Sequence, residues 1–492
     1  MNFTSVFRFD KLRRVGALIE EWCTPAPWIK KILHWFAKAV PVRLKARWSR
    51  LDKNKRHILV NMSIGLGISL ALNVFHLPPW FREKEENALD WVIAMNAGTR
   101  YGLSPSSSDR PEHFYAFVDV DEWTYRTWGE PLFTPREKLA ELIKDVVSAQ
   151  PSLVIVDVEL DHSNRDTPKH DVELQNILAG LPAGPPVILV KSLRPSLKPN
   201  SLPEPRQSFL DQIVSASDRL FWASPTFLSD DSQSIRRWKI AVCAAQNQEP
   251  TLLPSVQLLA YALLSHGPQG NLLGELTTQL KKNMEVCSGG TNDAQGSLVL
   301  GSQPFPLDEN GQENRILYSM KQGIAPQMIQ VGQEERPLFV SLPAQAILSG
   351  GAETSLQDTL HNRIVIIGGS FVDSHDIHKT PLGAMPGAMI ILNSLRSLFT
   401  YGVDHHPSWM VSVFIEVGLI ILMSFFFKWF NSFWGMLLSG AIIIVILLPA
   451  SLFAFHYGVW LDFAIPLGAV QIHRLAEELK KKHIDHDNKG WR

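Results

Sequence analysis

Four carboxylates stand at the ends of two apolar, β-rich runs of this chain. They are Asp119 and Asp121, which close the run 113–121, and Asp157 and Glu159, which close the run 152–160. The carboxyl ends of parallel strands meet at one edge of a sheet, and open α/β sheets bind ligands at that edge. We therefore treat these residues as a candidate site for a cation or a polar ligand. The alternative stays open that they cap the following helices or make surface hydrogen bonds.

A second group of polar residues follows a later apolar run. Gly368 and Gly369 end the run and offer backbone N–H groups to an anion, although neither a GxGxxG nor a P-loop pattern surrounds them. His375, Asp376 and His378 then place two imidazoles and a carboxylate within four residues. A metal would need further ligands brought in by folding, so we interpret this stretch as a polar loop. Gly368, Gly369 and Asp376 remain candidates for ligand binding.

Composition and motifs argue against several classes of function. The 47 Lys and Arg residues nearly balance the 48 Asp and Glu residues, so no global field indicates a nucleic-acid partner. Ser370 could act as a nucleophile, yet the chain has no G-x-S-x-G elbow around it. We expect no enzymatic activity, no cofactor and no metal.

The intervening elements predict an α/β domain with a mainly parallel sheet. Between the runs 113–121 and 152–160, the sequence Thr134-Pro135-Arg136-Glu137 has the pattern of a capping box with proline at the first helical position. The order strand, helix, strand implies a right-handed crossover and parallel pairing, with the two strands as neighbours. The other expected elements are helices at 171–179, at 256–264 and from about Pro386, and strands at 186–191, 238–244, 315–319 and 363–368.

Strongly apolar segments flank this domain, which we expect to occupy residues 80–400. The predicted transmembrane helices are 57–77, 409–427, 433–455 and 456–472. Each approaches the roughly 20 residues that a helix needs to cross a hydrocarbon core of about 30 Å. Glu416 lies inside the second of them, where an ionisable group is costly. It is a candidate coupling or assembly position, with an ordinary packing contact as the alternative.

The placement of cations predicts the orientation of the chain. Lys and Arg residues crowd 43–56 before the first span and 474–482 after the last, whereas the loop 401–408 contains neither. Because short cation-rich loops stay on the cytoplasmic side, we expect a basic cytoplasmic segment at 1–56, a cytoplasmic tail at 473–492 and an external domain. Whether aromatic residues hold the segment 1–56 on the lipid bilayer stays open.

Two cysteines fall within the external domain, where a disulfide is chemically permitted. Cys243 lies in an apolar run, and Cys287 begins a glycine-rich stretch. A bridge between them and a buried free thiol at Cys243 both remain open, and the free thiol is the ordinary explanation.

An ordered set of short motifs resembles the type 2 CHASE domain. The matching pieces are Phe117-Val118-Asp119-Val120-Asp121, Pro135-Arg136, Ile155-Val156-Asp157-Val158, Asp171-x-x-Leu174, Ile364-Val365-Ile366-Ile367-Gly368, Asp376, Thr380-Pro381-Leu382 and Met385-Pro386-Gly387. The resemblance implies an extracytoplasmic sensory module of a bacterial receptor in the cytoplasmic (inner) membrane, preceded by one span and followed by about three. Gly129 to Phe133 depart from the Trp-Pro-Trp-like stretch of many relatives, which puts ligand contacts from those aromatics in doubt.

Many such relatives continue into a kinase or a nucleotide cyclase, whereas this sequence ends about twenty residues after Ile472. The leading hypothesis is therefore a membrane-anchored protein that senses an unknown external ligand and relays a signal to a separate cytoplasmic or membrane partner. A constitutive envelope scaffold is the alternative, and a membrane-tethered hydrolase is a third.

Overall fold

The computed structural model describes residues 79–97, residues 113–403 with short gaps, and residue 418. The gaps are 164–167, 197–200, 230–232, 247–248, 268–269, 285–286, 288–296, 308–313, 324–326, 332–333 and 351–352. Among the described residues, no helix is both long and apolar enough to cross a membrane. The predicted spans 57–77, 409–427, 433–455 and 456–472, apart from residue 418, lie outside them. The segments 1–56 and 473–492 and the residue Glu416 also lie outside them.

A six-stranded parallel sheet forms the centre of the described domain. In spatial order its strands are β18 (Phe339–Pro343), β1 (Phe114–Val120), β19 (Arg363–Gly369), β2 (Leu153–Val156), β3 (Val187–Val190) and β6 (Leu220–Ala223). The central strands are continuous apolar runs, as expected for strands that are buried on both faces. The prediction of an α/β fold with a mainly parallel sheet is confirmed.

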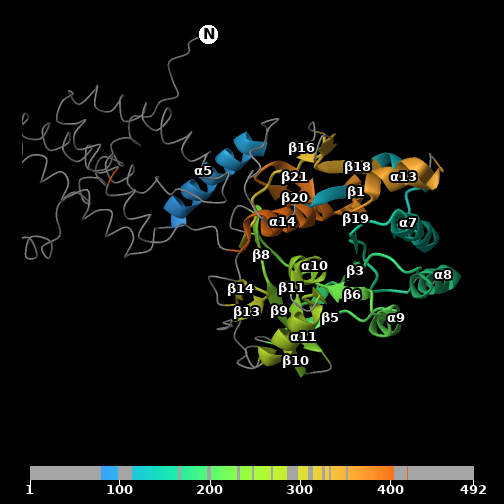
Figure 1. Ribbon diagram of the computed structural model, residues 1–492, viewed down its shortest axis with the longest axis horizontal. Helices are drawn as coiled ribbons and strands as arrows, with labels where there is room; N and C mark the ends of the chain where they lie inside the picture. Colours follow the sequence, from blue (N-terminus) through green and yellow to red (C-terminus); the bar gives the residue numbers. More distant parts are fainter. Residues whose placement is uncertain are drawn as a thin grey trace, which may run out of the picture. The chain divides into compact units, whose positions relative to one another are not determined.

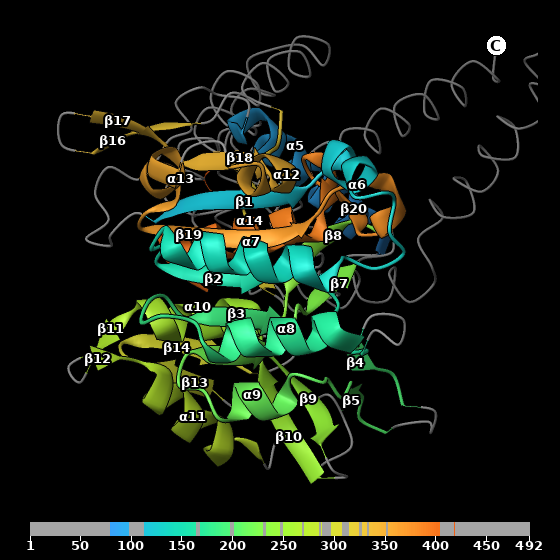
Figure 2. The ribbon, with the colours of Figure 1, turned by 90° about the vertical axis from the view of Figure 1, so that its right-hand side faces the viewer.

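Helices cover both faces of this sheet (Figures 1 and 2), and alternate strand residues belong to the core on each face. Ala116 and Val118 of β1 belong to the core of one face, and Tyr115 and Phe117 belong to the core of the other. The helices of the first face are α7 (Arg136–Ser148), α8 (Pro168–Ala179), α9 (Asp211–Ser215), α12 (Ala344–Leu348) and α13 (Glu353–Leu360). Those of the second are α5 (Pro79–Ala97), α10 (Val256–Leu264), α11 (Leu273–Lys282) and α14 (Gly387–Tyr401).

Shorter elements complete the domain. They are α6 (Glu122–Thr127), β4 (Leu193–Arg194), β5 (Glu204–Pro205), β7 (Phe227–Ser229), β8 (Ile235–Trp238), β9 (Ala241–Gln246), β10 (Glu249–Pro254), β11 (His266–Gly267), β12 (Gly270–Asn271), β13 (Ser297–Leu300), β14 (Gln303–Pro306), β15 (Asn314–Arg315), β16 (Met328–Val331), β17 (Glu334–Pro337), η2 (Val372–Ser374), β20 (Ile377–Thr380) and β21 (Gly383–Pro386).

The strands β1 and β2 are not neighbours, which corrects the expectation from sequence. The late strand β19 inserts between them and pairs with both. The chain reaches β19 only after β3, β6 and β18 have been placed, so a reading of successive elements along the chain does not detect the insertion.

Three local predictions are also wrong. The N-cap of α7 is Pro135 and makes no side-chain hydrogen bond, so the capping box from Thr134 to Glu137 does not form. The strand expected at 238–244 is split, because β8 pairs with β7 whereas β9 pairs with β10. Of the strand expected at 315–319, only Arg315 lies in a strand, as the last residue of β15.

The backbone of the residues after Arg315 forms hydrogen bonds with side chains of α14 instead of with a neighbouring strand. The backbone N–H of Leu317 donates to Ser397 Oγ at 3.2 Å, and that of Ser319 donates to Asn393 Oδ1 at 2.9 Å. These buried N–H groups are satisfied by helix side chains, so an apolar run that looks like a strand needs no strand partner here.

Cys243 and Cys287 form a disulfide. Cys243 lies in β9, and both residues are less than a tenth exposed. The bridge closes a loop that contains β10, α10 and α11.

Candidate functional site

Two acidic side chains flank a glycine at the carboxyl edge of the central strands. Asp119 of β1 is in register with Gly368 of β19, and the backbone N–H of Asp157 donates to the carbonyl oxygen of Ile367 at 2.8 Å. Strand alternation directs Asp119 and Asp157 to the face that α14 covers. The structure therefore places both carboxylates on the α14 side of the sheet, with Asp157 close to the beginning of that helix.

Gly368 is required where α14 meets the sheet. A Cβ atom at this position would lie 2.8 Å from Ala388 Cβ and 3.5 Å from Asp157 Cβ. The absence of a side chain lets the first turn of α14 contact β19 between the two carboxylates.

Asp376 binds the N-terminus of α14. The backbone N–H of Gly387 donates to the Asp376 carbonyl oxygen at 2.9 Å and to its Oδ2 at 3.1 Å. A Cβ atom on Gly387 would lie 2.6 Å from both carboxylate oxygens, so only glycine permits this approach. A carboxylate at a helix N-terminus is stabilised by the unsatisfied N–H groups and by the helix dipole.

A cavity of about 750 Å³ opens beside this helix start. Its polar lining includes Asp157, Asp376, His378 and Lys379, and its apolar lining includes Phe227, Ile235 and Ile391. β20 supplies the histidine, and β7 and β8 supply Phe227 and Ile235 of the apolar lining. The position matches the general rule that open α/β sheets bind ligands outside the carboxyl ends of their strands.

The carboxyl group of Asp157 is electrostatically unusual. Burial and, to a smaller extent, the nearby charge of Asp376 raise the pKa of Asp157 to about 7, although His378 acts in the opposite direction. His378 Nε2 lies 3.0 Å from Asp376 Oδ1, and this hydrogen bond raises the pKa of the imidazole. The cavity thus holds two acidic groups of like charge with one partly compensating histidine.

Asp119 is buried on the other side of Gly368. Its Oδ2 accepts hydrogen bonds from Gln322 Nε2 at 2.6 Å and from Ser370 Oγ at 2.8 Å, whereas its Oδ1 has no hydrogen-bond partner among the described residues. Burial raises the pKa of Asp119 to about 6 although these two hydrogen bonds oppose the change. Asp119 does not line the cavity.

Asp121 and Glu159 have structural roles, so the structure does not bring the four predicted carboxylates together. Asp121 is the N-cap of α6 and accepts a hydrogen bond from the Thr124 backbone N–H at 2.8 Å. Glu159 is exposed and forms an ion pair with Arg206 at 2.6 Å.

The glycine pair does not form an anion-binding loop. Gly368 and Gly369 continue β19 and stay in register with β1, and the backbone N–H of Ser370 donates to the Val120 carbonyl oxygen at 3.1 Å. Among the described residues, no group of three or more His, Cys, Asp or Glu side chains is arranged to hold a metal ion.

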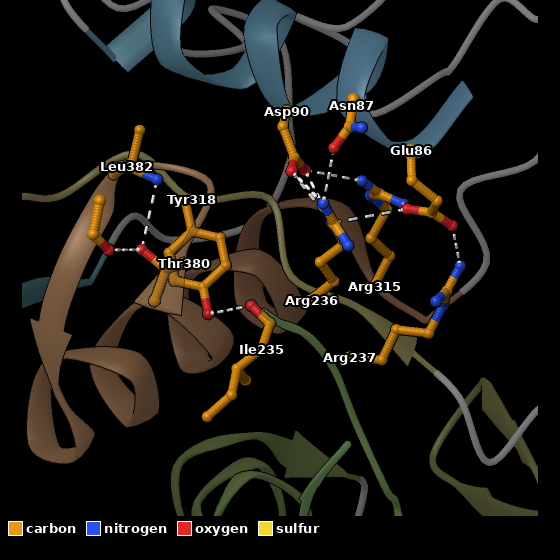
Figure 3. A network of polar contacts seen from close by, with 11 residues as sticks. Glu86, Asn87, Asp90, Ile235, Arg236, Arg237, Arg315, Tyr318, Thr380 and Leu382 are labelled. Carbon is orange, nitrogen blue, oxygen red and sulfur yellow. Dashed lines mark hydrogen bonds and ion pairs between the residues drawn. The ribbon is translucent and has the colours of Figure 1, made fainter. Parts of the chain in front are cut away.

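No pattern in the sequence predicts the part of the cavity lining that β7 and β8 form. This part of the lining also connects to α5, because Ile235 lines the cavity and the next residue, Arg236, contacts that helix (Figure 3). Arg236 Nη2 lies 2.5 Å from Asp90 Oδ2, and Arg315 Nη2 lies 3.2 Å from Asp90 Oδ1. We call Glu86, Asp90, Arg236, Arg237 and Arg315 the α5 ion cluster.

Neighbouring arginines stabilise the ionised form of Glu86 in this ion cluster. Burial acts to raise the pKa of Glu86, but the charges of Arg315 and Arg237 and their hydrogen bonds outweigh it, and the pKa is lowered. The side chain of Arg236 is only 4% exposed, so its ion pairs are screened weakly by water.

Comparison with known families identifies one match. A model described as the CHASE2 domain matches residues 66–439. Comparison with curated proteins finds no match, and comparison with solved structures finds none either.

Proposed function

Because the chain belongs to the CHASE2 domain family, a family of extracytoplasmic sensory domains, we propose that its α/β domain binds a small ligand in the cavity beside α14. The observation that supports this most strongly is the position of the cavity. It lies at the carboxyl ends of parallel strands and combines apolar walls with a few polar groups, which is typical of ligand sites.

Two routes lead from this cavity toward the predicted spans. Ile235 and Arg236 are consecutive in β8, so a ligand that shifts the cavity wall also shifts the α5 ion cluster. α5 follows the predicted span 57–77 in the chain, and α14 precedes the predicted span 409–427. We propose that these helices carry the signal to a separate cytoplasmic or membrane partner.

We propose that the site binds its ligand without chemical turnover. Ser370, the nucleophile considered from sequence, donates its hydroxyl hydrogen to Asp119 rather than to a histidine. In the usual serine nucleophile a histidine takes this proton, and among the described residues Ser370 is hydrogen-bonded to a buried carboxylate instead.

Ligand binding is tested by filling the cavity. Ser229 lines the cavity and is exposed, so Ser229→Trp should obstruct it without disturbing the core. Thr277→Trp, at an exposed position of α11, is the matched control. The full chain in mild detergent is screened by thermal shift against cationic, neutral and anionic small molecules.

We expect at least one compound that stabilises the wild type and the Thr277→Trp variant but not the Ser229→Trp variant. If no compound shows this pattern, or if every stabilising compound acts equally on both variants, the proposed ligand site is wrong.

The external placement of residues 80–400 needs its own test. A phosphatase reporter that is active only outside the cytoplasm, fused near residue 250, should be active. A fusion that is inactive although the protein is made, or a chain that carbonate removes from membranes, would contradict the proposed topology.

Relay to a separate partner is tested by affinity purification. The full chain, isolated in mild detergent, should reproducibly recover a cytoplasmic or membrane regulator. Asp90→Asn weakens the α5 ion cluster, so it should alter that association both in the presence and in the absence of ligand. Recovery of no regulator in repeated experiments counts against the relay.

A constitutive scaffold is the second candidate function. Exposed apolar side chains favour it, since Leu132 is 89%, Phe133 58% and Trp123 54% exposed. A scaffold predicts a stable complex with another envelope protein that no small molecule changes, and Leu132→Ser with Phe133→Ser should weaken that complex.

A further inference from the structure

The cavity beside α14 also indicates the chemical class of its ligand, an inference that rests on the proposed function. Its two carboxylates differ in how they are satisfied. Asp376 accepts a hydrogen bond from the Gly387 backbone N–H and contacts His378. The carboxylate of Asp157 accepts no hydrogen bond from any described residue, although it lies in the field of Asp376.

The neighbouring cationic side chains do not neutralise the carboxylate of Asp157. His378 is bonded to Asp376, at 3.0 Å, rather than to Asp157. Lys379 lies at an exposed position of β20, and its charge is not among those that act on the pKa of Asp157. A partly buried carboxylate that accepts no hydrogen bond from the described residues and is only partly compensated by His378 is costly, so a ligand that supplies positive charge and N–H donors there gains most.

Other ligand classes fit less well. An anion would meet two carboxylates, and the N–H group of Gly387 that could bind it already donates to Asp376. A metal ion would need more ligands than the described residues gather. A neutral ligand would cover Asp157 without neutralising it.

The apolar lining of the cavity indicates the nature of the rest of the ligand. Phe227, Ile235 and Ile391 present apolar surface to the same cavity. Such a wall favours an apolar body and, by excluding water, strengthens an ion pair at Asp157.

We infer that the cavity binds a small organic cation, a primary ammonium group on an apolar body, with the ammonium on Asp157 and the body against Phe227, Ile235 and Ile391. The ammonium donates hydrogen bonds to the carboxylate oxygens of Asp157. The volume of about 750 Å³ accommodates such a molecule with its bound water.

The test uses pairs of probes that differ only in the charged group. Isoamylamine, cyclohexylmethylamine and 2-phenylethylamine are each compared with the alcohol of the same skeleton and with the corresponding carboxylate. Binding to the full chain in mild detergent is measured by isothermal titration calorimetry at pH 8, where Asp157 is mostly ionised.

We expect at least one amine to bind at least tenfold more tightly than its alcohol, and Asp157→Asn to remove this preference. The variant should fold, because the raised pKa of Asp157 means that its charge is unfavourable in the folded protein. Asp358→Asn, at an exposed position of α13 on the other face of the sheet, is the control and should bind like the wild type.

The inference is overturned if no amine binds, if alcohols or carboxylates bind as tightly as amines, or if the amine preference survives Asp157→Asn. These outcomes are distinct from failure of the proposed function. A neutral or anionic compound whose stabilisation is lost in Ser229→Trp would support the ligand site while refuting the ammonium ligand.

Discussion

Replacing Gly387 by alanine should detach Asp376 from the start of α14. The new Cβ atom would lie 2.6 Å from both Asp376 carboxylate oxygens, well inside any tolerable contact, so the carboxylate must move. The movement breaks its hydrogen bond from the Gly387 N–H and leaves the helix N-terminus without its anion.

The expected loss follows from two opposing effects. A hydrogen bond to a charged group contributes about 1.5–3 kcal/mol, and the 40% exposure of the Asp376 side chain places this one at the lower end. Alanine is a better helix former than glycine by at most about 1 kcal/mol, and less in the first turn. The net destabilisation of the first turn should be about 1 kcal/mol, or roughly a fivefold increase in local opening.

Hydrogen–deuterium exchange of the full chain measures this opening directly at the amides of residues 387–391. The control is a double-mutant cycle with Asp376→Asn. The carboxylate no longer reaches the helix in Gly387→Ala, so Asp376→Asn should accelerate exchange in the wild-type background and have little effect in the alanine background. Strictly additive effects, or slower exchange in Gly387→Ala, would refute the assignment of Asp376 as the partner of this helix.

Three further predictions concern the rest of the domain. Gly368→Ala should destabilise it by about 1–3 kcal/mol in thermal unfolding, because its Cβ atom would overlap Ala388, whereas Gly274→Ala, in the open space around α11, should be neutral or slightly stabilising. Burial raises the pKa of Asp119 from 3.8 to about 6, so the stability that its protonated form contributes is complete below pH 3.8 and is lost as the pH rises through 6. The free energy of unfolding of Asp119→Asn should therefore rise by about 3 kcal/mol relative to that of the wild type between pH 4 and pH 8. A difference that does not depend on pH would contradict this prediction. The Cys243–Cys287 bridge spans 44 residues, so its reduction or the variant Cys287→Ala should lower the free energy of unfolding by up to about 4 kcal/mol. If a reductant has no effect on the stability of the wild type, the bridge is not formed.

Elements with a strong local pattern could be predicted from the sequence. The apolar run that ends at Asp119 forms β1, and the stripe beginning near Arg136 forms α7. Helix 256–264 is found with its predicted limits, because Ser255 accepts a hydrogen bond from the Leu258 backbone N–H as an N-cap. These features depend on residues only a few positions apart.

The candidate site was only partly predictable because it depends on distant pairing. Asp157 and Asp376 are separated widely in sequence, and only the insertion of β19 beside β2 and the start of α14 bring them to one cavity. The apolar wall at Phe227 and Ile235 carries no sequence signal for this role. Conversely, Asp121 looked like a ligand residue, yet its carboxylate satisfies a helix N–H three residues away.

Hydrogen–deuterium exchange with each compound that raises the melting temperature tests the ligand site most directly. If the cavity beside α14 binds the ligand, protection should appear together in β7–β8, in β20 and in the first turn of α14. Protection confined to other parts of the domain, or stabilisation without protection of these three segments, would contradict the account.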